Sequence, residues 1–301
     1  ITHALVEAGD PKYLYLAGRD WPDAHFSAAL GRAFVEVGVP KYLYLAGKAW
    51  SDARYTTAIA ERLVEQKDPE YLYLAGRYWP SRRRSHAFAM ALAEAGTPRH
   101  LYLAGKGWSK LLYSPAIAQA LIERGDAEYL YLAGRDWPAE RYDEAIAEAL
   151  IRHGDADRFY RAGRDWPTDR CGLALAKALV KWGGAKHFYL AGRDWPDERF
   201  CAAIGQALVK AGEACYLYFA GKDWPSTRFS KAIVRALAKT GDSLYLYLAG
   251  LNWPDGRYDD VILQALIRTR HIERLHLALE GWPMTRVTGA LLRALRNGYS
   301  I

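Results

Sequence analysis

The feature that most constrains the fold is a 29-residue repeat, which runs through the chain without a single insertion or deletion. The segment Tyr-Leu-Tyr-Leu-Ala-Gly-Arg-Asp-Trp-Pro begins at Tyr13, and its relatives begin at residues 42, 71, 100, 129, 158, 187, 216, 245 and 274. Units of this length cannot bury their apolar faces alone and must stack on their neighbours. We therefore expect one repeat domain over residues 1–301, with ten repeats and a leading half repeat at residues 1–12.

Each repeat contains the pattern of two helices. Positions are numbered by the first full repeat, so that position 21 is Trp21. Residues 12–21 carry apolar side chains at i, i+3, i+4 and i+7, and Pro22 prevents this helix from continuing. Residues 23–37 form a longer, Ala-rich helical pattern that Gly38 closes. Tyr-Leu-Tyr-Leu alone would also suit a strand, but the Ala-rich half favours helix. The sequence thus predicts an all-α solenoid, a superhelix of two-helix repeats.

Small and aromatic residues recur at positions that face the predicted core. Position 21 is Trp in all ten repeats and lies on the apolar stripe of the first helix, so we expect it to be buried. Ala17 and Gly18 recur with it, and we expect them to let neighbouring helices approach closely. A glycine after the second helix is expected to adopt the left-handed conformation. These glycines are Gly38, Gly96, Gly125, Gly154, Gly183, Gly212 and Gly241.

One repeat carries the motif in its fullest form, as Asp68-Pro69-Glu70-Tyr71-Leu72-Tyr73, then Ala75-Gly76-Arg77 and Trp79-Pro80. It resembles the short tandem helical repeats of many phage and bacterial proteins, which follow a pattern of roughly Asp-Pro-Glu-Tyr-Ala-Tyr and then Arg-Trp-Pro. The resemblance covers the whole chain at the level of pattern. It implies a helical repeat fold and carries no activity with it.

The two ends of the chain depart from the regular repeat. Residues 1–12 align with the second half of a repeat, so we expect the chain to start inside a helix whose partner lies upstream. In the tenth repeat Leu279 replaces the glycine of position 18, Glu280 the basic residue, and Arg296 an apolar residue. Polar substitution at a terminal repeat is typical of a C-terminal cap.

Tyrosines at position 15 and cations at position 19 form a possible ladder along the first helices. One interpretation is a row of aromatic platforms and cations that stacks bases and neutralises phosphates. The other is structural: the tyrosines lie half-buried between repeats, and the cations cover them and pair with nearby aspartates. The ladder includes Tyr15, Arg19, Tyr44, Lys48, Tyr73, Arg77, Tyr131 and Arg135.

A second basic series occupies position 25, at the expected start of the second helix. A cation at a helix N-terminus opposes the macrodipole, so helix stability alone does not explain the series. We expect salt bridges between repeats or contact with a ligand. The candidate binding residues of this series are Arg54, Arg83, Arg141, Arg170, Arg199, Arg228 and Arg257.

Position 36 changes sign along the chain, from Glu36, Glu65, Glu94 and Glu123 to Arg152, Lys181, Lys210, Lys239 and Arg268. The numbers of charged residues in the two halves of the chain agree with this change. Residues 1–150 hold 18 Lys and Arg against 19 Asp and Glu, whereas residues 151–301 hold 23 against 15. Two interpretations stay open: a binding stripe of two charges, or a solvated face with neutral variation.

The scattered histidines form no recurring pattern of catalytic or metal-ligating residues, and the three cysteines show no CxxC spacing. We therefore expect no enzyme activity, no metal and no cofactor. No apolar run approaches the roughly 18–20 residues that a membrane span needs, so we expect no membrane insertion. Three reduced cysteines favour an intracellular setting, with secretion or delivery to a host as the alternative.

We expect a scaffold that binds a macromolecular partner, in the first place a protein, along a concave polar face that is acidic in the N-terminal half and basic in the C-terminal half. End-to-end association of two solenoids would also match this charge pattern. The alternative is nucleic-acid binding through the Tyr and Arg/Lys ladders, which the net charge of +7 favours.

Overall fold

The computed structural model describes residues 1–170, 172–287 and 289–298, and within them the chain forms 21 α-helices and no β-strand. Helices pack in sequence order against their nearest neighbours. The predicted all-α helical repeat is confirmed. The chain forms two compact units, Ile1–His153 (the N-unit) and Gly154–Ile301 (the C-unit). The repeat frame continues through this boundary, so the single repeat domain stays a prediction.

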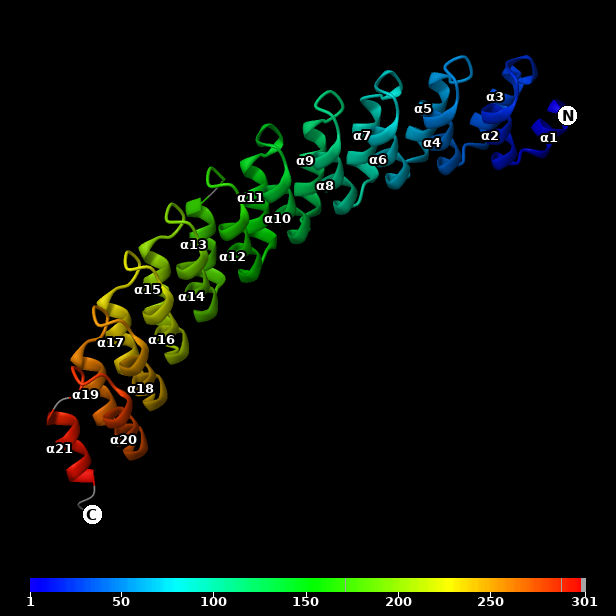
Figure 1. The fold of residues 1–301 in the computed structure, drawn as a ribbon. Coiled ribbons are helices and arrows are strands. Elements are labelled where there is room, and N and C mark those ends of the chain that lie inside the picture. Colours follow the sequence, from blue (N-terminus) through cyan, green and yellow to red (C-terminus); the bar gives the residue numbers. More distant parts are fainter. Residues whose placement is uncertain (171, 288, 299–301) are drawn as a thin grey trace. The chain divides into compact units, whose positions relative to one another are not determined.

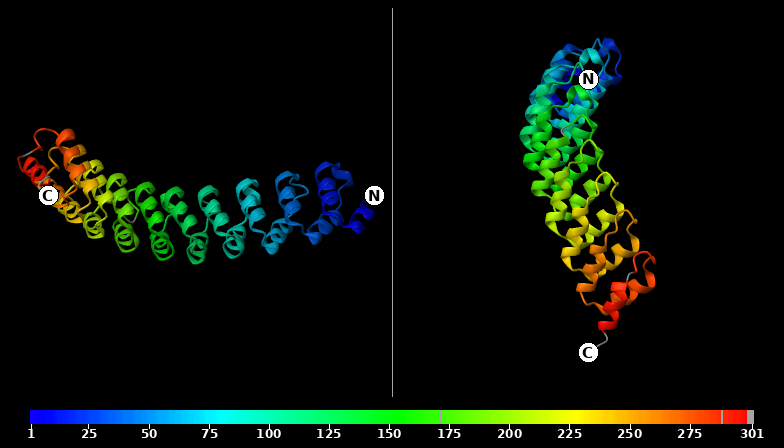
Figure 2. Two further views of the ribbon diagram at one scale, coloured as in Figure 1. Left: turned by 90° about the horizontal axis from the view of Figure 1, so that it is seen from below. Right: turned by 90° about the vertical axis from the view of Figure 1, so that its left-hand side faces the viewer.

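In both units the first helices of the repeats form one row and the second helices another (Figures 1 and 2). The first helices of the N-unit are α2 (Pro11–Asp20), α4 (Pro40–Ala49), α6 (Pro69–Tyr78), α8 (Pro98–Gly107) and α10 (Ala127–Asp136). Its second helices are α1 (Thr2–Ala8), α3 (Ala28–Val37), α5 (Thr57–Gln66), α7 (Ala87–Ala95), α9 (Pro115–Arg124) and α11 (Glu144–His153).

The C-unit repeats the same arrangement. Its first helices are α12 (Ala156–Asp165), α14 (Ala185–Asp194), α16 (Ala214–Asp223), α18 (Ser243–Asn252) and α20 (Ile272–Gly281). Its second helices are α13 (Gly172–Trp182), α15 (Ala202–Ala211), α17 (Lys231–Thr240), α19 (Asp260–Arg268) and α21 (Gly289–Gly298).

The first helix lies one residue earlier than predicted, at Pro11–Asp20 in the first full repeat, so the tryptophan follows the helix instead of ending it. In α6 the Asp68 carboxylate accepts hydrogen bonds from the backbone N–H groups of Glu70 and Tyr71, and Pro69 occupies the first turn, where no N–H is needed. Trp79 leaves the helix in an extended conformation, and Pro80 follows it.

The second helix is shorter than predicted. Residues 23–37 were expected to be one helix, but Asp23–His25 form a 3-10 turn and α3 begins at Ala28. Phe26 is extended, and its ring packs edge-on against Trp50 at 5.5 Å between centroids. Ser27 then caps α3 by accepting a hydrogen bond from the Leu30 N–H. A continuous helix could not direct both side chains in this way.

The glycines after the second helix follow the prediction only in part. Gly38, for example, closes α3 in the left-handed conformation with φ of 63°, and Gly125, Gly212 and Gly241 behave likewise. Gly96 does not: its φ is −66°, and the chain leaves α7 in an extended conformation toward Thr97-Pro98. Gly183 also lacks a positive φ, whereas the non-glycine Lys67 has one, of 51°.

Within each unit, the tryptophan of a repeat lies directly on the glycine of the repeat before it. A Cβ atom added to Gly47 would lie 2.0 Å from Cζ2 of Trp79, so no other residue fits beneath this ring. The Trp79 Nε1–H donates a hydrogen bond of 2.9 Å to the Tyr44 carbonyl. The ring of Trp79 is fully buried, while Trp21 of the first full repeat is half-buried. We call this contact the Trp–Gly lock, and it confirms the predicted close approach at position 18.

Two alanine substitutions against the same ring test this lock. A Cβ at Gly192 would lie 2.1 Å from Trp224, whereas one at Gly205 would lie 3.8 Å from it. We expect Gly192→Ala to lower the free energy of unfolding by about 2–3 kcal/mol, because the indole must move. Gly205→Ala should raise it by about 0.5–1 kcal/mol, since alanine is the better helix former. Urea unfolding followed by circular dichroism measures both, and equal effects would contradict the lock.

Candidate binding surface

The arginines of position 25 lie in the junctions between repeats, not on an exposed face of the second helix. Arg83 donates hydrogen bonds of 2.9 Å to the carbonyls of Gly47 and Trp50, at the C-terminal end of α4, and its side chain is 4% exposed. These carbonyls have no partner within their own helix. A cation at this end favours the helix dipole, so the arginine stabilises the preceding repeat rather than its own second helix.

The same contact recurs along both units. The guanidinium groups that donate to the position-18 carbonyl of the preceding repeat are those of Arg54, Arg83, Arg141, Arg199, Arg228, Arg257 and Arg286. Arg170 is buried too. Several also pair with the preceding position-23 aspartate, as Arg83 does with Asp52 at 2.5 Å. Of the two explanations that the sequence left open, the structure shows the contact between repeats.

At one junction a different arginine donates to the end of the preceding first helix. The fourth repeat has Leu112 at position 25, so no guanidinium reaches back from it. Instead Arg84, which occupies position 26 of the third repeat, donates a hydrogen bond of 2.7 Å from Nε to the carbonyl of Trp79. Leu112 is buried beside this junction. The helix end therefore keeps a cation although the series is interrupted.

Most side chains of the Tyr and Arg/Lys ladder form contacts within and between repeats. The ring of Tyr131 is 1% exposed, and the Arg135 guanidinium lies 5.5 Å from its centroid. Arg135 also pairs with Asp136 at 2.7 Å. Tyr15 and Tyr44 are buried and pack against Tyr42 and Tyr71 of the next repeat, while Tyr73 is half-buried. Arg19 lies over Tyr15, Arg77 binds the Gly107 carbonyl, and Lys48 lies near Tyr78.

Asp136 is the most connected carboxylate of this ladder. It accepts hydrogen bonds from Arg135, from Lys106 and from the Tyr102 hydroxyl. The Arg135 guanidinium, with smaller contributions from Lys106 and Tyr102, holds the pKa of Asp136 well below its ordinary value, although partial burial opposes this shift. Burial raises the pKa of the Tyr102 hydroxyl, and the bonded Asp136 raises it further. These groups stabilise the stack through the contact between neighbouring repeats.

Positions 28, 32 and 36 of the second helices form an exposed surface, which we call the outer stripe. Every described residue at these positions is exposed in both units. The stripe includes the predicted acidic residues Glu36, Glu65, Glu94 and Glu123 and the predicted basic residues Arg152, Lys181, Lys210, Lys239 and Arg268. Its residues differ from repeat to repeat, whereas positions 15, 18, 21 and 25 recur. The structure therefore separates the exposed candidates from the buried ones.

Shallow grooves lie between neighbouring second helices, beside the outer stripe. One groove of about 550 Å³ crosses α5, α7 and α9 in the N-unit, with Ala91 and Ala120 in its lining and Glu94 and Glu123 among its polar residues. Others of about 500 and 590 Å³ lie between α3 and α5 and between α15 and α17. The alanines that recur in the second helices leave room for these grooves, because larger side chains would fill them.

Two exposed apolar residues, Met90 in the stripe and Trp182 beside it, were missed at the level of sequence. Met90 is 50% exposed and lines the groove of the N-unit, and Trp182 is 60% exposed at the end of α13. Trp182 lies outside the Trp frame, and Met90 occupies a position that is polar in most repeats. These departures from the frame were the available signal.

No family model, curated protein or solved structure matches the chain. Among residues 1–170, 172–287 and 289–298, no three or more His, Cys, Asp or Glu side chains gather as metal ligands would. The described helices include none that is both long and apolar enough to cross a membrane.

Removal of a position-25 arginine should destabilise the junction behind it. Arg141 donates to the carbonyls of Gly105 and Trp108 at 2.6 and 2.8 Å and is buried. We expect Arg141→Leu to lower the free energy of unfolding by about 2–3 kcal/mol, because two carbonyls lose a charged donor. Arg99→Leu, at an exposed site, should change it by no more than about 0.5 kcal/mol. Urea unfolding compares the two, and a similar cost for both would argue against the capping role.

Asp136 should make the free energy of unfolding depend on pH in the acidic range. Because its folded pKa lies below its ordinary value of 3.8, the stabilisation is fully present above that value and is lost as the pH falls below it and through the folded pKa. We expect Asp136→Asn to cost about 1–2 kcal/mol at pH 7 and much less near pH 2. Glu140→Gln, at an exposed carboxylate, is the control. Urea unfolding from about pH 6 to pH 2 measures the difference, which must shrink as the pH falls.

Proposed function

We propose that the chain is a non-enzymatic scaffold that binds a protein partner through the outer stripe and its grooves. The observation that supports this proposal is that recurring and variable polar residues occupy different places in the repeat. The recurring polar residues, among them Arg83 and Tyr131, serve contacts between repeats, while the exposed residues of the stripe vary. Variable side chains on a regular helical framework are typical of repeat proteins that recognise other proteins.

The grooves support a protein rather than a polyanion as the general partner. Protein interfaces combine an apolar centre with a polar rim. In the N-unit groove, Ala91, Ala120 and Met90 provide apolar surface, and Glu94 and Glu123 provide charge. Lys67 pairs with Glu94 in this groove, and the N-unit has no net charge, so a nucleic acid does not suit the N-unit.

The two units offer different charges to a partner. Residues 1–153 hold 19 Lys and Arg and 19 Asp and Glu, whereas residues 154–301 hold 22 and 15. The whole net charge of +7 therefore belongs to the C-unit. A partner with a basic segment for the N-unit stripe and an acidic one for the C-unit would bind in one direction only.

A charge exchange along the stripe tests the proposal at constant net charge. The stripe variant combines Glu94→Lys, Glu123→Lys, Lys210→Glu and Lys239→Glu. The control variant makes the same exchange off the stripe, with Lys186→Glu, Lys222→Glu, Glu140→Lys and Asp169→Lys, all at exposed residues. Each tagged chain is incubated with a nuclease-treated lysate of its own cells, and the captured proteins are quantified.

We expect a specific captured protein to fall at least about tenfold with the stripe variant and to stay unchanged with the control, because only the first alters the binding surface. Circular dichroism must show the same helical content for all chains. Equal capture by both variants, or capture that nuclease treatment removes, would refute the proposal.

A further inference from the structure

The second helices of the C-unit carry an unusual excess of positive charge. Helices α13, α15 and α17 contain Lys and Arg but no Asp or Glu. Their exposed cations are Lys177, Lys181, Lys210, Lys231, Arg235 and Lys239. These cations together create a positive electrostatic potential at the surface. The surface therefore favours an anionic partner.

Most of these cations have no partner inside the protein. Within the described residues, Lys210, Arg235 and Lys239 form no hydrogen bond or ion pair, in contrast to Arg228 of the same unit, which pairs with Asp197. Arg235 and Lys239 are four residues apart on α17 and therefore lie on one face of the helix. Their charges remain available to a ligand.

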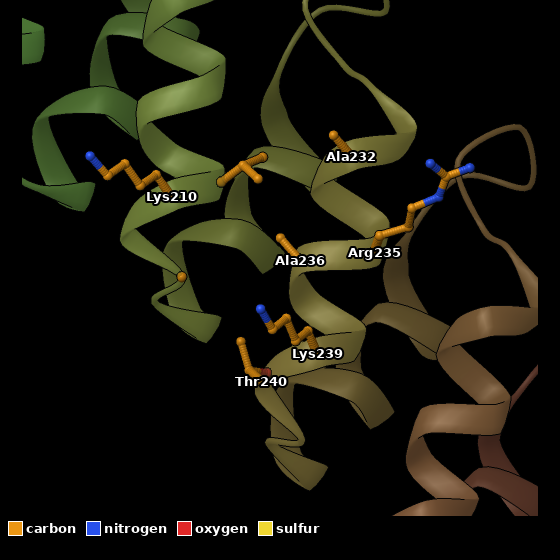
Figure 3. A pocket seen from close by; sticks show the side chains of 8 residues that line it. Lys210, Ala232, Arg235, Ala236, Lys239 and Thr240 are labelled. Carbon is orange, nitrogen blue, oxygen red and sulfur yellow. The ribbon is translucent and has the colours of Figure 1, made fainter.

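An apolar groove of about 520 Å³ lies between these cations. It is formed by the end of α15 and by α17, and Val209, Ala232 and Ala236 contribute apolar surface to it. Figure 3 shows Lys239 extending from α17 toward α15, while the Lys210 and Arg235 side chains extend to opposite sides of the groove that Ala232 and Ala236 help to line. The neighbouring groove of about 590 Å³ shares Val209, Lys210 and Ala232, so the two form one trough along α15 and α17.

An exposed tryptophan adds an anchor to the same surface. Trp182 ends α13 at position 37, the position that Thr240 occupies at the groove, and the Lys181 ammonium lies 4.7 Å from its ring. Exposed Trp side chains and charged residues around small apolar pockets are typical of the centres of protein interfaces. Binding of a partner would bury this indole, which is exposed to water in the free protein, and its burial would stabilise the complex.

These features suit a polypeptide better than a nucleic acid. A phosphate backbone needs cations and hydrogen-bond donors, and bound bases need a series of aromatic platforms. The groove of about 520 Å³ offers alanine and valine between its cations, which suits small aliphatic side chains. Phe200 and Phe229 line the neighbouring part of the trough, but they are half-buried and pack edge-on against Trp224 and Trp253. Its position-15 tyrosines, Tyr189 and Tyr218, are buried.

We infer that the stripe of α13, α15 and α17 binds an acidic peptide segment of a partner protein, with aliphatic side chains in the trough and carboxylates on Lys181, Lys210, Arg235 and Lys239. This inference rests on the proposed protein-binding function. Three helices about 10 Å apart span about 20 Å, which roughly six extended residues cover. A short linear segment is therefore long enough.

The test uses a fluorescent peptide of about ten residues, rich in Glu with Leu at intervals, and the full chain at low salt. The groove variant is Lys210→Glu with Lys239→Glu. Its matched control is Lys186→Glu with Lys222→Glu, which makes the same change in net charge on the first helices of the same unit. A Lys/Leu peptide and a single-stranded oligonucleotide serve as competing probes, and Trp182→Ala tests the anchor.

We expect the groove variant to weaken binding of the acidic peptide at least about tenfold and the control variant by less than about threefold, because only the groove contacts the carboxylates. Trp182→Ala should weaken it by about threefold or more. The inference fails if the acidic peptide does not bind, if both double variants weaken it equally, or if the oligonucleotide binds more tightly and with the same groove dependence. If it fails while the stripe exchange still abolishes protein capture, the proposed function stands and only the acidic-segment inference is lost.

Discussion

Within each unit, the contact of a tryptophan with the glycine one repeat earlier is the constraint on which the rest of the structure depends. It places the indole Nε1–H of Trp79 on the carbonyl of Tyr44, 35 residues back. The following arginine reaches 36 and 33 residues back to the same helix end, as Arg83 does at Gly47 and Trp50. Since all three contacts converge on one helix terminus, an inserted residue on either side would displace them together. This explains why the period of 29 residues never varies.

The architecture could be predicted from the sequence because it depends on the spacing of residues along the chain. Helical periodicity, Pro22 after the tryptophan and the constant period predict two helices per repeat, stacked on their neighbours, and the structure confirms this. The start of the second helix was wrong because Phe26 leaves helical geometry to pack on Trp50. That contact joins two repeats, and no pattern within one repeat indicates it.

The candidate site was predicted less evenly, and the difference has a physical cause. The partners of Arg54 and Arg141 are backbone carbonyls, which every residue carries and which leave no mark on a sequence. Recurrence of an arginine therefore looked the same for a binding role and for a capping role. Position 36 needed no partner to be recognised: its charge changes while position 35 stays apolar through the first nine repeats, which indicates exposure, and the structure places it at the surface.

The third junction shows how closely these structural residues depend on one another. At six other junctions an aromatic ring at position 26 lies beneath the next arginine, as Tyr113 lies 4.9 Å from Arg141. At the third junction both members are exchanged: Arg84 replaces the ring and Leu112 replaces the arginine, yet the Trp79 carbonyl still receives a guanidinium donor. A solvated surface position would not require its neighbour to change with it. The contacts of the outer stripe are of another kind: Gln119 donates to Glu123 within one helix and Lys67 pairs with Glu94, all at exposed side chains. Exposed pairs of this kind contribute little to stability, so these side chains can exchange their contacts for those of a partner.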